Sequence, residues 1–208
     1  TQEQIQKLIE QAKTDHGVDL EIDKTYRYCV LSNRKKNYLG VTDSGKVDVK
    51  GLTGKKSHTP GFIKKLFFDL LDVLSEVKTM EDFVKAKKQI SEKIADCGKK
   101  VEAKEIPLED LTFNVMLSKA PSEYVKTIPQ HIRAAKQLES IRELKKGDKI
   151  SFIKILNKPG VKPVELAKKE EIDSKKYMEF LESTLEQITS SMDLDFDTIL
   201  GKPKQTGL

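Results

Sequence analysis

Basic residues gather in one stretch of this 208-residue chain, and a tyrosine lies among them. Residues 24–65 hold eleven lysines and arginines against two acidic residues, and inside this stretch the sequence reads Arg34-Lys35-Lys36-Asn37-Tyr38. Residues 1–23 carry a charge of −4 and residues 66–208 a charge of zero, so the formal net charge of +5 conceals a local charge of +9. Concentrated cations favour nucleic acid, because each neutralised phosphate releases a counterion. The alternative is a solvated charged surface.

The sequence Gly51-Leu52-Thr53-Gly54-Lys55-Lys56-Ser57 follows a predicted strand and precedes a predicted helix, as a phosphate-binding loop does. The nucleotide-binding pattern needs a Gly five residues before the Gly-Lys pair and a Ser or Thr directly after the Lys. Val49 and Lys56 stand there instead, so we interpret the stretch as a basic loop that touches a phosphate backbone. The residues that we expect to contact nucleic acid are Lys24, Arg34, Lys35, Lys36, Tyr38, Lys55 and Lys56.

Two acidic residues, Glu21 and Asp23, come just before the basic stretch. On a strand, residues two apart face the same side, and paired carboxylates can support a Mg²⁺ ion in phosphoryl transfer. Two acids alone do not make such a site, and an exposed acidic edge balanced by Lys24 is the alternative. The three histidines and two cysteines show no zinc-ligand spacing, and no Ser or Cys has a nucleophile context. The residues alone therefore predict no metal site and no complete catalytic centre.

The elements that position these residues change character along the chain. Apolar residues at helical spacing predict a helix over residues 2–14, ended by His16 and Gly17. A period of two then predicts extended segments over residues 18–30, 36–41 and 46–50, with Asp43-Ser44-Gly45 as a hairpin turn between the last two. The first quarter of the chain is thus one helix with short antiparallel strands.

The remainder of the chain is mostly helical. Thr59 as a cap and Pro60 at the first helical position predict a helix with an apolar stripe through Val77. A second helix is predicted from Thr79 to a stop at Gly98, with Met80 and Val84 facing inward. Residues 107–118 are unassigned, and the remaining predictions are a helix over residues 128–141, a strand over residues 149–156 and a last helix over residues 177–192.

These elements predict an α+β chain in which short antiparallel strands with a helix are followed by a mainly helical region, with a division near residue 58. Hydrophobic residues make up 37% of the chain and charged residues 34%. No apolar run approaches the ~18 residues of a membrane span, and no signal peptide is recognisable. We therefore expect a soluble, cytoplasmic protein without a membrane partner. Because the first residue is Thr1, we also expect a piece of a longer chain or an assembly.

Several segments, taken in order, resemble family B DNA polymerases, and most closely the archaeal, crenarchaeal-type replicative enzymes. Residues 18–26, 34–40 and 45–51, with Thr59-Pro60 leading a helix, are similar to the late palm of that family. Residues 129–138, residues 146–152 and the helix around Tyr177 are similar to its thumb. The resemblance spans nearly the whole chain, and it implies that residues 1–58 are the C-terminal part of the palm and residues 59–208 the thumb.

The resemblance implies a role in DNA-directed DNA synthesis. Lys36 and Tyr38 match a Lys-x-Tyr motif that touches the primer-template duplex near the primer end, and Asp23 matches an auxiliary carboxylate, where Glu is commoner. The family's main metal-binding aspartates and its nucleotide-gripping helix are missing from the sequence. The chain alone is therefore expected to be inactive, with Mg²⁺ held mainly by residues outside it.

The implied partners are the primer-template duplex and the remaining polymerase portion, namely exonuclease, fingers and the rest of the palm. Residues 205–208, Gln-Thr-Gly-Leu, resemble the first half of a peptide that binds the sliding clamp. The alternative function is a non-catalytic duplex-DNA-binding subunit, for example the small half of a split polymerase.

Overall fold

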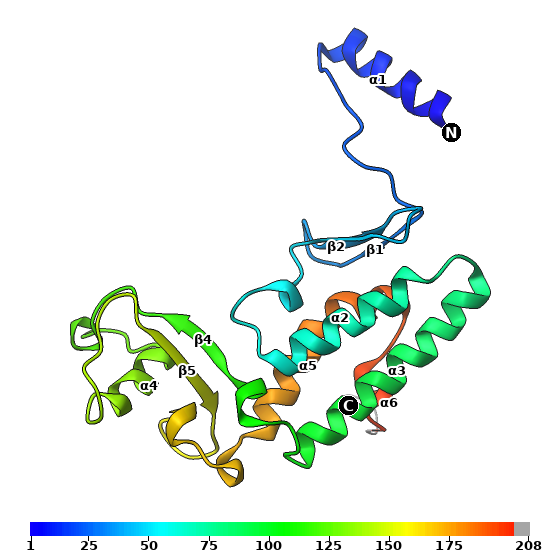
Figure 1. Cartoon of the computed structure of the whole chain (residues 1–208). Coiled ribbons are helices and arrows are strands. Elements are labelled where there is room, and N and C mark those ends of the chain that lie inside the picture. Colours follow the sequence, from blue (N-terminus) through cyan, green and yellow to red (C-terminus); the bar gives the residue numbers. More distant parts are fainter. Residues whose placement is uncertain (202–208) are drawn as a thin grey trace, which may run out of the picture.

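The computed structural model describes residues 1–201 as helices with two small antiparallel sheets (Figure 1). The first sheet comprises β1 (Tyr28–Leu31), β2 (Tyr38–Val41) and β3 (Val47–Lys50), and the second comprises β4 (Phe113–Met116), β5 (Lys149–Lys154) and β6 (Val161–Pro163). The α-helices are α1 (Gln2–His16), α2 (Gly61–Ser75), α3 (Met80–Glu102), α4 (Gln130–Leu138), α5 (Ser174–Thr189) and α6 (Phe196–Ile199). The predicted α+β class is therefore confirmed.

The first sheet has the order β1-β2-β3, and one of its faces is buried. Val30 of β1 lies opposite Leu39 of β2, and Leu39 lies opposite Val49 of β3; all three pack into the core. Because side chains alternate across a strand, the residues between them lie on the outer face. The hairpin turn predicted at residues 43–45 is confirmed, with Gly45 at φ 82° between β2 and β3.

The helix α2 begins one residue later than the sequence suggests. Pro60 is its N-cap, so the expectation of Thr59 as cap and Pro60 as first helical residue is wrong. The Thr59 hydroxyl is buried and donates to the carbonyl oxygen of Thr53 at 2.8 Å, so it is not available to the helix amides.

The helix α3 begins where it was predicted, with Thr79 capping it, but two other expectations for it are wrong. Gly98 does not end the helix, which runs to Glu102. Gly98 instead allows close packing, because a Cβ there would lie 2.5 Å from Cδ2 of Leu200. Met80 and Val84 are 76% and 64% exposed rather than inward. Val84 lies two residues, or about 200°, from the buried Ala86 around the helix, so the two cannot share a face.

The second sheet packs against α4 on one side and joins the helices through α5. Residues 107–118, unassigned from sequence, form the short 3₁₀ turn Leu108–Leu111 and then β4. Tyr177 of α5 is fully buried, and its hydroxyl donates to the carbonyl oxygen of Leu111 at 2.7 Å and accepts from the amide of Lys154 at 3.0 Å. The ring of Tyr177 contacts Phe62 and Phe113 with 6.0 Å between centroids. One tyrosine thus connects α2, β4, β5 and α5.

The N-terminal helix α1 stands apart from the rest of the chain in Figure 1, connected to β1 by an open segment. The helix is as predicted, with a capping box at Thr1 and a left-handed Gly17 at its end. The strand expected to start at residue 18 is wrong, since β1 begins only at Tyr28 and residues 18–26 pair with no other strand in the structure. Within the described residues, this segment does not pair with the edge of either sheet.

One hydrophobic core runs through both sheets and the helices between them. It includes Leu39 of the first sheet, Phe67 of α2, Ile94 of α3, Ile150 of the second sheet and Leu185 of α5. Residues before and after the predicted division near residue 58 therefore share a core. Among residues 1–201, no helix is long and apolar enough to cross a membrane.

Candidate nucleic-acid interface

The basic residues 34–36 project from a closed loop between β1 and β2. The amide of Ser32 donates to the carbonyl oxygen of Asn37 at 3.2 Å, and the amide of Asn37 donates to that of Arg34 at 3.2 Å. Lys36 takes a left-handed conformation with φ 61°. All three cationic side chains are exposed. Backbone hydrogen bonds therefore fix this loop while its cations face solvent.

The loop lies directly against the chain after β3. A Cβ at Gly51 would lie 2.3 Å from Oδ1 of Asn37 and 2.5 Å from the carbonyl oxygen of Lys36, so only a glycine allows this approach. Gly51 also has φ 69°, which disfavours other residues. This contact brings Lys50 beside the basic loop. The exposed residues Lys55 and Lys56 follow five and six positions after Lys50.

The segment that carries Lys55 is fixed by α5 through a reciprocal pair of hydrogen bonds. Gln187 accepts from the amide of Thr53 at 2.9 Å through Oε1 and donates to the Thr53 hydroxyl at 3.0 Å through Nε2. Gln187 is 5% exposed, so both bonds are protected from water. Gln187 also borders a small hollow that the loop residues Ser32 and Arg34 line from the other side. The basic loop and the segment after β3 thus meet at the end of α5.

The outer face of the first sheet places a tyrosine beside a lysine at this same end. Tyr38 lies directly opposite Lys50 in the β2–β3 register, and directly opposite Leu31 in the β1–β2 register. Residues in directly opposite positions project to the same face. Leu31 is 64% exposed, Lys50 is exposed and Tyr38 is half-buried. We call Arg34, Lys35, Lys36, Tyr38, Lys50, Lys55 and Lys56 the basic end of the sheet.

Lys24, expected to contact DNA, is engaged elsewhere on the same face. Its Nζ lies 2.6 Å from Oδ2 of Asp48, which also accepts from the Tyr26 hydroxyl at 2.7 Å. The hydrogen bond from Lys24, and then that from Tyr26, lowers the pKa of Asp48 to about 2. The same carboxylate raises the pKa of Lys24. Lys24 therefore neutralises the charge of Asp48. As a result, this carboxylate does not offset the positive charge of the basic end.

The ring of Tyr26 lies across Gly40 and beside Tyr38. A Cβ at Gly40 would come within 2.5 Å of the Tyr26 ring, so a glycine is required there. The rings of Tyr26 and Tyr38 meet edge to face with 6.3 Å between centroids. Asp48 lies opposite Gly40 in the register and holds the Tyr26 hydroxyl. The ring of Tyr38 is thus supported by a packed neighbouring ring.

The two acidic residues before the basic stretch do not lie on a strand. Glu21 and Asp23 are exposed in the open segment between α1 and β1, so the expectation that a strand aligns their carboxylates is wrong. Within residues 1–201, no three His, Cys, Asp or Glu side chains gather closely enough to hold a metal ion. Glu21 and Asp23 therefore belong to no such cluster among the described residues.

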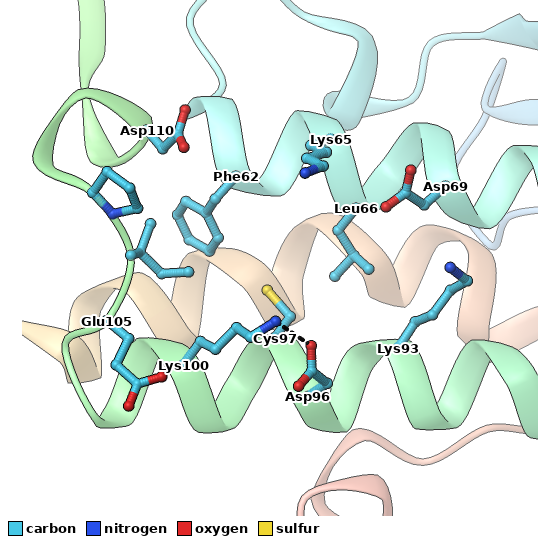
Figure 2. A pocket seen from close by; sticks show the side chains of 12 residues that line it. Phe62, Lys65, Leu66, Asp69, Lys93, Asp96, Cys97, Lys100, Glu105 and Asp110 are labelled. Atoms are coloured by element: carbon cyan, nitrogen blue, oxygen red, sulfur yellow. Dashed lines mark hydrogen bonds and ion pairs between the residues drawn. The ribbon is translucent and has the colours of Figure 1, made fainter.

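A hollow between α2 and α3 also holds chemically active side chains, none of which belongs to the basic end (Figure 2). It encloses about 430 Å³, with Phe62, Leu66 and Cys97 at its apolar base. Charged residues surround it, including the Lys100–Asp96 pair at 2.7 Å. Burial raises the pKa of the Cys97 thiol to about 11, which removes it as a thiolate nucleophile near neutral pH.

Sequence reasoning missed three contributors to the interface. Lys50 was in the basic stretch and on a predicted strand, so its outward position opposite Tyr38 could have been inferred from the alternation. Asp48 and Gln187 gave no such signal. Their partners Lys24 and Thr53 are 24 and 134 residues away along the chain. The peptide at residues 205–208, expected to bind a sliding clamp, lies outside the described residues.

Comparisons with known proteins identify the family. The family model described as DNA polymerase family B matches residues 1–197. The chain is 40% identical over 201 residues to DNA polymerase 1 of Sulfolobus acidocaldarius, covering 96% of this chain and 23% of that protein. It is 42% identical over 195 residues to DNA polymerase 1 of Sulfurisphaera ohwakuensis, covering 93% of this chain and 22% of that protein.

The fold agrees with these matches. The family B DNA polymerase from the hyperthermophilic archaeon Pyrobaculum calidifontis superposes with a TM-score of 0.60 at 18% identity, covering 98% of this chain and 25% of that one. The chain thus spans less than a quarter of the length of the two curated relatives. The match of the family model over nearly the whole sequence, together with these identities, shows that the chain belongs to DNA polymerase family B.

Proposed function

We propose that this chain is the part of a DNA-directed DNA polymerase that grips the primer-template duplex. Residues 1–58 would be the C-terminal part of the palm and residues 59–208 the thumb. The observation that carries the proposal is the basic end of the sheet, where Tyr38 lies opposite Lys50 and the closed loop of Arg34, Lys35 and Lys36 faces solvent. Cations on a fixed scaffold suit phosphates spaced along a duplex.

Contacts of this kind position a duplex without reading its sequence. Lysines bind phosphate oxygens, which are the same at every base pair. The half-buried ring of Tyr38, supported by Tyr26, offers a flat apolar surface beside Lys50 that suits a sugar or the edge of a base pair. We therefore assign Arg34, Lys35, Lys36, Lys50, Lys55 and Lys56 to phosphates and Tyr38 to the groove. Lys24 contributes through Asp48 instead, since it is held at 2.6 Å from that carboxylate.

Synthesis requires the remaining polymerase portion. Attack of the primer 3′-hydroxyl on a nucleotide would need Mg²⁺, and we propose that residues outside this chain mainly hold it. Asp23 is proposed as an auxiliary carboxylate; it is exposed and precedes the Lys24–Asp48 pair. The isolated chain is therefore expected not to extend a primer. The match to proteins named DNA polymerase favours this function over a non-catalytic duplex-binding subunit.

A chimeric polymerase tests the proposal. Residues 1–208 replace the matching region of DNA polymerase 1 of Saccharolobus solfataricus, which is 40% identical over 196 residues. The chimera is expected to extend a primer with Mg²⁺, and Lys36→Ala with Tyr38→Ala to reduce extension at least tenfold, about 1.4 kcal/mol. The matched control is Lys88→Ala with Lys99→Ala, two exposed lysines of α3. Equal activity of the two double variants would remove Lys36 and Tyr38 from the interface.

A further inference from the structure

Lys55 and Lys56, two of the lysines that we assign to phosphates, lie on a short segment whose backbone is held firmly. Their ammonium groups are exposed, and within residues 1–201 neither has a hydrogen-bond or ion-pair partner. The backbone just before them is closely packed, because a Cβ at Gly54 would lie 2.3 Å from the ring of Phe67 on α2. The backbone of the segment is therefore fixed while its two charges stay free to bind.

Thr53, two residues before Lys55, ties the segment to the helices. Its carbonyl oxygen accepts from the buried Thr59 hydroxyl at 2.8 Å. Its amide and its hydroxyl both bond to Gln187 of α5, at 2.9 Å and 3.0 Å. A side-chain amide suits this contact because it offers an acceptor and a donor next to each other. Gln187 is 5% exposed, so water does not compete for either bond.

The helix α5 connects this point to the second sheet. Tyr177, near the start of the helix, accepts from the amide of Lys154 in β5, and Gln187 follows about 15 Å further along the helix axis. Just after α5, the Ser191 hydroxyl donates to the carbonyl oxygen of Leu31, directly before the basic loop. One helix thus holds the second sheet near its start and the basic end of the sheet near its end (Figure 1).

We infer that Gln187 is a positioning residue for duplex binding, which holds Lys55 and Lys56 where they meet the phosphates. The inference rests on the proposed function. Because Gln187 is buried, it acts on DNA only through the segment that it holds. A lysine on an ordered backbone loses less conformational freedom on binding than one on a mobile backbone, so fixing the segment should raise the affinity for the duplex.

Duplex binding by the chimera with the Saccharolobus solfataricus polymerase tests the inference. Gln187→Met removes both hydrogen bonds to Thr53 and keeps a side chain of similar length. At fixed salt, we expect it to raise the dissociation constant for a labelled primer-template at least about threefold. In a chimera that also carries Lys55→Ala and Lys56→Ala, the same substitution should change the dissociation constant by less than about 1.5-fold, because the groups through which it acts are gone.

This difference separates positioning from a purely structural role. A residue that only stabilised the fold would weaken binding by the same factor with or without the two lysines. The matched control is Thr184→Val, which removes another buried polar group of α5, one whose hydroxyl donates to Phe180 of the same helix at 2.8 Å. It should leave duplex binding unchanged. Equal factors for Gln187→Met in the two backgrounds, or no weakening when the lysines are present, would overturn the inference.

Two substitutions of Thr53 provide a second comparison that perturbs the fold less. Thr53→Val keeps the shape of the side chain but loses the hydroxyl bond to Gln187, whereas Thr53→Ser keeps a hydroxyl. We expect Thr53→Val to weaken duplex binding only when Lys55 and Lys56 are present, and Thr53→Ser to bind as the unsubstituted chimera does. If circular dichroism shows that Gln187→Met does not fold, this pair decides, and equal binding by the two Thr53 variants would contradict the positioning role.

The two proposals fail in different ways. A chimera that shows the lysine-dependent loss of binding but does not extend a primer would refute the proposed function and keep the positioning role. A chimera that extends a primer, but in which Gln187→Met acts equally with and without the two lysines, would refute the positioning role and keep the function.

Discussion

Replacing Tyr177 by Phe should destabilise the chain far more than the loss of one oxygen atom suggests. The Tyr177 hydroxyl is fully buried and donates to the carbonyl oxygen of Leu111 at 2.7 Å while accepting from the amide of Lys154 at 3.0 Å. Phe keeps the ring contacts but leaves both backbone groups without this partner. A buried polar group left unsatisfied costs ~1–3 kcal/mol, so we expect the free energy of unfolding to fall by roughly 2–4 kcal/mol when both lose their partner.

Urea unfolding followed by circular dichroism measures this loss. With a denaturant slope of about 2 kcal/mol per molar, the midpoint should fall by about 1–2 M. The matched control is Tyr124→Phe, because among residues 1–201 the Tyr124 hydroxyl bonds only to the exposed Ser118 hydroxyl, at 2.8 Å, and its loss should cost under about 0.5 kcal/mol. Equal midpoints for the two variants would refute the reasoning that this hydroxyl fixes the second sheet to the helices.

The remaining predictions concern the sheet face and the two cysteines. Gly40→Ala places a Cβ 2.5 Å from the Tyr26 ring, so it should cost about 1–3 kcal/mol in urea unfolding. The lowered pKa of Asp48, about 2 against 3.8, means that its contribution to stability is present above pH 4 and lost as the pH falls toward 2. Unfolding free energy should therefore fall less steeply over that range in Asp48→Asn than in the wild type. A thiol reagent at pH 8 should modify exposed Cys29 at least about tenfold faster than Cys97, whose pKa burial raises to about 11.

Local patterns predicted the helices and most strands, because those depend on neighbouring residues. The Asp43-Ser44-Gly45 turn and the start of a helix at Thr79 are set within a few residues, and both are confirmed. The strand expected over residues 18–30 is confirmed only from Tyr28, and its first part is wrong in this structure for a different reason. Its alternation is that of a strand, but a strand also needs pairing with a neighbour, and among the described residues this segment pairs with no strand.

The candidate site could be predicted only in part. The basic stretch and Tyr38 were visible in the sequence because charge and residue type are local. Which lysines are free and how they are held depend on partners that are distant in the sequence. Asp48 engages Lys24, and Gln187 of α5 fixes Thr53 in the segment that carries Lys55. Interior glycines were similarly ambiguous. Gly98 looked like a helix stop, but it marks the point where Leu200 packs against α3.

The most direct test of the central claim is the salt dependence of duplex binding by the chain. Fluorescence anisotropy with a labelled primer-template gives the slope of log affinity against log salt for the wild type and for Lys35→Ala with Lys36→Ala. Each phosphate contact contributes about 0.9 to the slope, so the double variant should lower it by about 1.8, with the same affinities on a scrambled base sequence. An unchanged slope, or an affinity that follows base sequence, would contradict a basic end that grips duplex DNA by its phosphates.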